Sequence, residues 1–272
     1  MRQPTTRQLE KLEDLKNYLR RLHSVAVAFS GGVDSTFLLK VAADVLGERA
    51  IAVTVDSPFF PGRESDEAKA FCRAQGIRQV VCELKVLEVA EVAQNPKDRC
   101  YYCKKEIFHQ IQAVAQENKM ERVIEGSNTD DDGDYRPGMR AVAELGVESP
   151  LKVCRLSKAD IRVLSQYLRL STWKKPSFAC LASRFAYGEP ITEEKLKMVE
   201  QAEQLLFDLG FLQFRVRVHG RVARIEVEPR EFAKVMEDTV RGKITEKFRE
   251  YGFSYTSLDL CGYRMGSMNE EL

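Results

Sequence analysis

The sequence predicts an α/β protein: a parallel sheet with crossover helices, followed by a smaller α+β domain. Two observations lead to this class. Short apolar runs rich in β-branched residues alternate with helical stretches in the first part of the chain, as in βαβ units. Near Pro190 this alternation is replaced by a long helix and a hairpin pattern. With 272 residues, 44% of them hydrophobic, the chain is long and apolar enough to build a substantial core.

The elements of the first domain follow in order. An amphipathic helix with leucines at positions 9, 12, 15, 19 and 22 opens the chain. The expected strands cover residues 25–29, 51–55, 80–84 and 122–125, and helices follow from Asp34, from Glu64 and after Cys103. Ser157 begins a further, capped helix. Ligands of such a sheet bind at the carboxyl ends of its strands, three of which are polar or glycine-rich here: residues 30–35, 56–58 and 125–128.

The smaller domain begins near residues 186–191, so the expected domains are 1–188 and 189–272. The pattern predicts a helix over 192–209 that Gly210 ends, and then a hairpin with strands over 214–218 and 222–227. Helices over 230–237 and 245–251 and a strand over 255–260 complete an α+β unit.

Charge and cysteine content limit the possible partners. With 42 basic and 41 acidic side chains the net charge is +1, so no global field recruits nucleic acid. No apolar run reaches membrane-spanning length, and the N-terminus is typical of an amphipathic helix rather than a signal peptide. We therefore expect a cytoplasmic protein whose seven cysteines are reduced, bind metal or act in catalysis.

The segment from Ser30 to Ser35 is typical of a phosphate-binding loop. Gly31 and Gly32 lack a Cβ, so their N–H groups can close on an anion, and the helix that begins at Asp34 adds its positive dipole end. A bare Gly-Gly is equally compatible with an ordinary turn. The whole string, Ser30, Gly31, Gly32, Val33, Asp34 and Ser35, resembles the PP-loop of ATP pyrophosphatases, which implies that it holds the β,γ-pyrophosphate of ATP.

Cys100 and Cys103 form a C-x-x-C motif whose chemistry depends on further ligands. Alone, the motif fits a redox pair, half a zinc site or part of a cluster site. The chain has no second C-x-x-C and no histidines at zinc-finger spacing, so three thiolates on a 4Fe–4S cluster fit better. Cys180 is the best third ligand, although a buried structural thiol is an equal alternative there. The remaining cysteines lie beside apolar residues and are expected to be buried structural thiols: Cys72, Cys82, Cys154 and Cys261.

Charged residues offer two further candidate sites. On a strand, Arg215 and Arg217 point to the same face and favour an anion, unless Glu226 or Glu228 simply balances them across the hairpin. Glu203 and Glu226 are a weaker alternative as metal ligands. Mg²⁺ for ATP needs only one or two carboxylates, and the acidic residues that could supply them are Glu125, Asp130, Asp131, Asp132 and Asp134.

Segments spread over nearly the whole chain resemble the LarE family of ATP-dependent sulfur transferases. They are residues 30–35, 56–57, 63–64, 125–128, 130–131, 136–138, 179–184, 215–219 and 262–267. The resemblance implies an adenine nucleotide α-hydrolase-like fold and a substrate, pyridinium-3,5-biscarboxylic acid mononucleotide, whose carboxylate is adenylated and then receives sulfur on the way to the nickel-pincer nucleotide of lactate racemase. The implied site residues are Asp56, Ser57 and Gly126 for ATP, in addition to the PP-loop, Arg184, Arg215 and Arg217 for the substrate phosphate, and Cys180 for sulfur.

The sulfur source divides this family. Its best-known members sacrifice the cysteine that matches Cys180, which becomes dehydroalanine. Cys100 and Cys103 depart from those members and suggest the cluster-bearing variety, in which sulfide on an open iron supplies the sulfur. A sulfide or sulfur donor and a homo-oligomer are the partners to expect.

Three other functions are weighed against this one. A tRNA thiolation enzyme shares the PP-loop and three-cysteine chemistry, but the chain lacks an evident basic extension. An amidating synthetase of the NAD or GMP type leaves the cysteines unexplained. A nucleotide sensor without turnover is the alternative from outside the enzymes.

Overall fold

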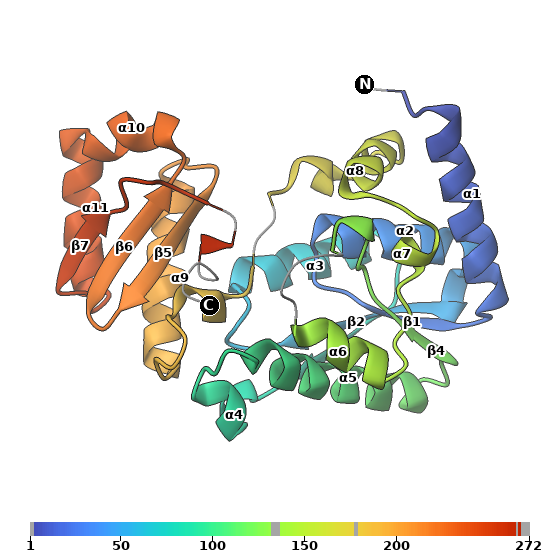
Figure 1. Ribbon diagram of the computed structural model, residues 1–272. Coiled ribbons are helices and arrows are strands. Elements are labelled where there is room, and N and C mark those ends of the chain that lie inside the picture. The colour runs from blue at the N-terminus through green and yellow to red at the C-terminus, as the bar shows by residue number, and fades with distance from the viewer. Residues whose placement is uncertain (1–2, 132–136, 177–178, 265, 268–272) are drawn as a thin grey trace. The chain divides into compact units, whose positions relative to one another are not determined.

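The computed structural model describes residues 3–131, 137–176, 179–264 and 266–267. By its contacts the chain divides into two units: unit 1 comprises residues 1–86 and 98–178, and unit 2 comprises residues 87–97 and 179–272 (Figure 1). The division falls before residue 188 because the segment that follows Cys180 packs on unit 2, where Phe185 bridges to Val218. Residues 87–97 join unit 2 because the Asn95 side-chain amide donates to the carbonyls of Ala186 and Glu189.

Unit 1 contains a four-stranded parallel sheet in the order β3-β2-β1-β4, which confirms the predicted α/β class. The strand β1 (Val25–Ala28) lies between β2 (Ala50–Asp56) and β4 (Arg122–Ile124), and β3 (Gln79–Glu83) forms an edge. The helices of unit 1 are α1 (Thr6–Arg21), α2 (Val33–Leu46), α3 (Gly62–Gln75), α5 (Arg99–Glu117), α6 (Pro137–Glu144), α7 (Pro150–Val153) and α8 (Lys158–Tyr167).

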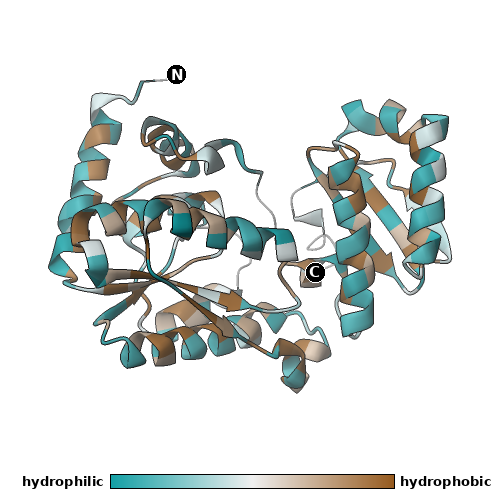
Figure 2. Ribbon diagram, turned by 180° about the vertical axis from the view of Figure 1, so that it is seen from behind, coloured by the Kyte–Doolittle hydropathy of each residue, from teal (hydrophilic) through white to brown (hydrophobic). Residues whose placement is uncertain are grey.

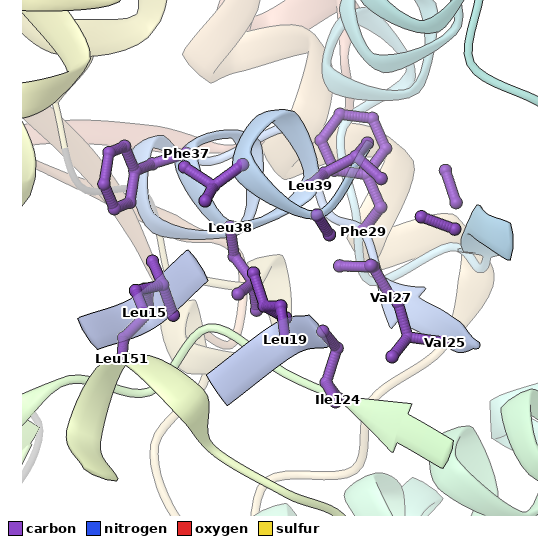
Figure 3. Close-up of a cluster of buried hydrophobic side chains, with 14 of the residues drawn as sticks. Leu15, Leu19, Val25, Val27, Phe29, Phe37, Leu38, Leu39, Ile124 and Leu151 are labelled. Atoms are coloured by element: carbon purple, nitrogen blue, oxygen red, sulfur yellow. The ribbon is translucent and has the colours of Figure 1, made fainter. Parts of the chain in front are cut away.

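Helices cover both faces of this sheet, so β1 is apolar at every position. Val25 and Val27 pack with residues of α1, α2 and α8 in one core layer, drawn in Figure 3. Ala26 points to the opposite layer, where it packs with Phe108 and Ile111 of α5. Figure 1 shows α1, α2 and α8 on one side of the sheet and α5 and α6 on the other. A strand buried on both faces is expected to be continuously hydrophobic.

Local signals set the helix ends of unit 1. Ser157 caps α8 through a capping box with Asp160, as its sequence predicts. The helix that was expected to follow Cys103 begins earlier, at Arg99, so Cys100 lies in the first turn of α5 and Cys103 in the second. The C-x-x-C motif therefore has helical geometry instead of belonging to the preceding loop.

Unit 2 contains a three-stranded sheet in the order β5-β6-β7. β5 (Phe214–His219) and β6 (Val222–Val227) form the predicted antiparallel hairpin, and β7 (Tyr255–Leu258) pairs with β6 in parallel. Its helices are α4 (Ala90–Ala93), α9 (Glu193–Asp208), α10 (Phe232–Met236) and α11 (Asp238–Glu250), and the 3₁₀ helix η5 (Leu181–Arg184) follows Cys180. The helix expected over 245–251 is thus longer at its N-terminal end.

Within each unit, the apolar residues gather on the strands and on the helix faces that cover them. In Figure 2 the strands are largely brown, whereas the outward faces of the helices are teal. Among the described residues, no helix is both long enough and apolar enough to cross a bilayer.

We expect Leu19→Ala to destabilise the protein by about 2–5 kcal/mol, because the side chain is fully buried and its loss leaves a cavity. Leu9→Ala is the matched control on the same helix, since Leu9 is 40% exposed. Urea unfolding monitored by circular dichroism measures both. Equal midpoints for the two variants would contradict the packing of α1 onto the sheet.

Candidate active site

The loop between β1 and α2 has the geometry of an anion-binding site. Gly31 adopts a left-handed φ of 72°, a conformation that glycine adopts without steric cost. A Cβ at Gly31 would also lie 3.3 Å from the Cβ of Ala68 and 3.3 Å from the carbonyl oxygen of Glu64 on α3. Gly32 is the N-cap of α2 and makes no side-chain cap. The N-terminal N–H groups of α2 are therefore available to an anion, with the helix dipole behind them.

Two polar strand ends flank this loop, because β2 and β4 are the neighbours of β1. Asp56 ends β2, and the buried Ser57 follows it. After β4 the chain passes against the start of α2: a Cβ at Gly126 would lie 3.0 Å from the backbone nitrogen of Ser35. Only glycine permits this approach. The residues that the sequence assigns to ATP in unit 1 thus meet at one edge of the sheet.

Asp34 lies in the first turn of α2, and its two carboxylate oxygens differ in their surroundings. Its Oδ2 accepts a hydrogen bond from Lys158 Nζ, whereas its buried Oδ1 has no hydrogen-bond partner among the described residues. Burial raises the pKa of Asp34 above its ordinary value, and Lys158 offsets only part of this effect. A cation at Oδ1 would stabilise the carboxylate.

The acidic residues at and after the end of β4 already accept hydrogen bonds. Glu125 Oε2 accepts from the backbone and the hydroxyl of Ser127, at 3.0 and 2.8 Å. Asp131 accepts from the backbone nitrogen of Asn128, and Asp130 accepts from the backbone nitrogen of Lys158. In this arrangement they order the loop after β4 and the start of α8. Asp132, Asp134 and Arg136 lie outside the described residues.

Cys100 and Cys103 lie one helical turn apart, so their side chains share a face of α5. The guanidinium of Arg99 is buried, and its Nη2 lies 3.7 Å from Cys100 Sγ. All seven cysteines are in the described part of the chain, and none forms a disulfide. Among the described residues, no group of three or more His, Cys, Asp or Glu side chains is placed to hold a metal ion.

The remaining thiols of unit 1 are poor nucleophiles. Burial raises the pKa of Cys72 and of Cys154 to about 11, and it also raises the pKa of Cys82. At neutral pH these thiols stay protonated. The expectation that these cysteines are buried holds for Cys72, whereas Cys82 and Cys154 are half-buried. It is wrong for Cys261, which is exposed in unit 2, in the turn that follows β7.

In unit 2, Cys180 is the N-cap of η5 and is half-buried. Its carbonyl accepts from the backbone and hydroxyl of Ser183 and from Arg184 Nη1. Arg184 is 1% exposed and forms a two-pronged ion pair with Glu203 of α9, with both distances 2.8 Å. This pair fixes the loop that carries Cys180.

Arg215 and Arg217 of β5 are also buried and so do not lie on a solvated face. The alternative, that Glu226 balances these charges across the hairpin, holds for Arg217. Arg217 pairs with Glu226 through both carboxylate oxygens, at 3.0 and 3.1 Å. Arg215 donates to the Phe214 carbonyl and lies over the ring of Tyr263. Burial, and then the nearby Arg184, lower the pKa of Arg215 to about 10. Arg215 is therefore a buried cation, whereas the carboxylates of Glu203 and Glu226 are paired with Arg184 and Arg217.

Comparison with known proteins identifies the family of this chain. Residues 1–134 match the family model described as a PP-loop domain. The chain is 36% identical over 255 residues, 93% of its length and 92% of the relative's, to pyridinium-3,5-bisthiocarboxylic acid mononucleotide synthase of Lactiplantibacillus plantarum. The chain belongs to the LarE family. These enzymes are ATP-dependent sulfur transferases.

Two further relatives differ in how much of this LarE-family chain they match. An uncharacterised Synechocystis protein is 42% identical over 262 residues, 96% of this chain and 98% of that protein. A component of the glutamine-hydrolysing GMP synthase of Thermoplasma acidophilum is 29% identical over 196 residues, 67% of this chain and 63% of that component. The latter similarity is partial, whereas the LarE-family match extends through unit 2.

Two lysines lie beside the PP-loop of this LarE-family chain, and the sequence alone does not predict their positions there. Lys158 contacts Asp34 from the start of α8, and Lys175 Nζ donates to the Gly31 carbonyl at 3.1 Å. They lie 124 and 144 positions from their partners, so no local pattern links them to the loop. The capping box at Ser157 was the one available signal, because it places Lys158 at the first position of a helix.

We expect Gly126→Ala to weaken ATP binding by about 1–3 kcal/mol, the usual cost of forcing a methyl group into packed surroundings. The reason is the 3.0 Å approach to Ser35 at the start of α2. Gly242→Ala is the control, because a Cβ there meets nothing within 4 Å. Isothermal titration with ATP measures both variants. Wild-type affinity in Gly126→Ala would place the nucleotide away from this edge.

Proposed function

We propose that the protein adenylates a carboxylate of pyridinium-3,5-biscarboxylic acid mononucleotide and replaces it with a thiocarboxylate. The observation that carries this proposal is the PP-loop with an open helix N-terminus, in a chain similar over nearly its full length to a synthase of the bisthiocarboxylic acid mononucleotide. A loop that grips the β,γ-pyrophosphate leaves the α-phosphorus open to attack by a substrate carboxylate. That attack releases pyrophosphate and forms an acyl-adenylate.

Unit 1 supplies the ATP site in this scheme. The N–H groups of Gly32 and the first turn of α2 hold the pyrophosphate, with Asp56, Ser57 and Gly126 on the flanking strand ends. We assign Mg²⁺ to Asp34, because its buried Oδ1 lacks a hydrogen-bond partner among the described residues. One carboxylate together with phosphate oxygens is a common Mg²⁺ ligand set.

Sulfur then attacks the acyl carbon, and AMP leaves. Cys180 is the proposed sulfur-bearing residue, and the chain itself supports its nearness to the ATP. Lys175 contacts Gly31, and Cys180 follows five positions later, so extended chain spans at most about 18 Å between the two residues. This limit holds for any arrangement of the two units.

Unit 1 could supply two ligands of a cluster, Cys100 and Cys103. Two thiols lie on one face of α5, and the Arg99 guanidinium beside Cys100 favours a thiolate and donates toward its sulfur. We propose Cys180 as the third ligand. A 4Fe–4S cluster held by three thiolates would leave one iron open to sulfide, and the protein would then keep its own sulfur.

Arg184, Arg215 and Arg217 are the proposed ligands of the substrate phosphate. Burial, and then the nearby Arg184, lower the pKa of Arg215, and an anion beside the guanidinium would stabilise its buried charge, which supports this role. Arg184 and Arg217 also pair with Glu203 and Glu226, and these ion pairs hold the two guanidinium groups in place.

The function is tested by following pyrophosphate, AMP and thiocarboxylate formation with ATP and the mononucleotide. Pyrophosphate release that depends on the mononucleotide is expected, and ADP as the main product would contradict the proposal. Asp34→Ala should lose most of this activity, whereas Glu13→Ala, on the exposed face of α1, should not. Release without the mononucleotide, or equal loss in both variants, would also count against it.

The sulfur source is decided by the intact mass of the protein after anaerobic turnover. An unchanged mass is expected, together with bound iron and sulfide that Cys100→Ala, Cys103→Ala and Cys180→Ala each abolish. A loss of about 34 Da would instead mean that Cys180 gave up its sulfur and became dehydroalanine. Cys72→Ala is the control, because its thiol is buried in the core of unit 1.

Arg215→Ala should raise the KM for the mononucleotide about tenfold or more, the loss typical of one charge-assisted hydrogen bond, while the Kd for ATP stays unchanged. Arg221→Ala in the exposed hairpin turn is the control. Steady-state kinetics and ATP titration separate the two effects. A higher Kd for ATP in Arg215→Ala would instead assign Arg215 to the nucleotide site.

A further inference from the structure

The peptide group between Gly31 and Gly32 poses a problem for a loop that binds through its N–H groups. Neither residue has a Cβ, so this peptide can rotate at low cost. When it rotates, the Gly31 carbonyl oxygen replaces the Gly32 N–H at the anion and repels it. Within the loop, the Gly32 N–H makes only a long hydrogen bond, 3.4 Å, to Ser30 Oγ. A second contact, on the carbonyl side of the peptide group, would help to select one orientation.

Lys175 provides such a contact. Its Nζ donates to the Gly31 carbonyl oxygen at 3.1 Å. Because a trans peptide is planar and its C=O and N–H point in opposite directions, holding the carbonyl turns the Gly32 N–H away from the lysine. The ammonium also polarises the peptide group, which makes that N–H a stronger donor.

The lysine is itself held from several directions. Its Nζ lies 2.7 Å from Glu67 Oε2 and 3.7 Å from Glu64 Oε2, and its side chain is only 14% exposed. On α8, Arg162 donates to the carbonyls of Trp173 and Lys175, at 2.6 and 2.9 Å. An exposed ion pair with Glu67 alone would contribute little. The contact with Gly31, and the bracing by Arg162, distinguish Lys175 from an ordinary surface lysine.

The geometry points to Lys175 as a positioning residue of the ATP site: it orients the Gly31–Gly32 peptide group for the β,γ-pyrophosphate. It acts through Gly31 and not by touching the reacting atoms. The inference rests on the proposed function only in that the loop binds the pyrophosphate part of ATP. It also explains why the segment just before the end of unit 1 returns to the PP-loop.

Lys175→Met tests this inference, because it keeps the aliphatic stem and removes the ammonium. The probes are ATP, inorganic pyrophosphate and AMP, each titrated calorimetrically in the presence of Mg²⁺. We expect the Kd values for ATP and pyrophosphate to rise about tenfold or more, the effect of losing one charge-assisted hydrogen bond. The Kd for AMP should stay the same, since AMP lacks the β,γ pair.

Two further variants sharpen the experiment. Lys174→Met is the matched control, because Lys174 is exposed and lies over the Trp173 ring. This variant should bind all three probes as the wild type does. Lys175→Arg retains a cationic donor and should recover most of the affinity for pyrophosphate. Equal weakening of AMP and ATP in Lys175→Met, or no weakening of pyrophosphate, would overturn the inference. Neither outcome depends on the pyridinium substrate, so a failure here is distinguishable from a failure of the proposed function.

Discussion

The site of unit 1 depends on keeping the N-terminus of α2 uncovered while the backbone packs tightly around it. Gly31 meets α3 and Gly126 meets Ser35 at distances that leave no room for a Cβ without displacement. The central strand β1 carries the chain to this point between two neighbours, so three strand ends converge there. The unmatched N–H groups of α2 attract an anion because their partners within the helix do not exist. Glycine at both contacts is what leaves that space to a phosphate group.

Around this site, carboxylates and cations compensate one another. Lys158 contacts Asp34, and Lys175 contacts Glu67, so the cations next to the loop are held before any nucleotide binds. The same arrangement recurs in unit 2, where Arg184 and Arg217 are buried with Glu203 and Glu226. Burying a guanidinium without a carboxylate would be costly, and removing one partner would leave the other charge buried alone. Substitutions of Arg184 or Arg217 will therefore report on stability as well as on binding, which makes Arg215 the more informative position.

The seven thiols differ in chemistry because their surroundings differ. Burial in the core of unit 1 keeps Cys72 and Cys154 protonated. Cys100 has a guanidinium beside its sulfur, and the loop of Cys180 is tied to Arg184. The proposed sulfur chemistry uses cysteines whose segments contact arginines and omits those in apolar surroundings. Lys175 donates a hydrogen bond to the PP-loop and lies five positions before Cys180, so one short segment serves both half-reactions of the proposed sequence.

The sequence by itself determined the elements that rest on local rules. Alternating apolar runs produced the parallel sheet, the Ser-Gly-Gly string marked the phosphate loop, and Ser157 capped α8, because each depends on residues within a few positions of one another. Arg215 and Arg217 were recognisable as candidates, but their burial against Glu226 and the η5 segment was not, since strand alternation does not show what covers each face. More than a hundred residues separate Lys158 and Lys175 from the loop residues that they contact. Tertiary structure decided those contacts, because hydrogen bonds between distant segments are set by the packing of whole helices and leave no periodic trace in the chain.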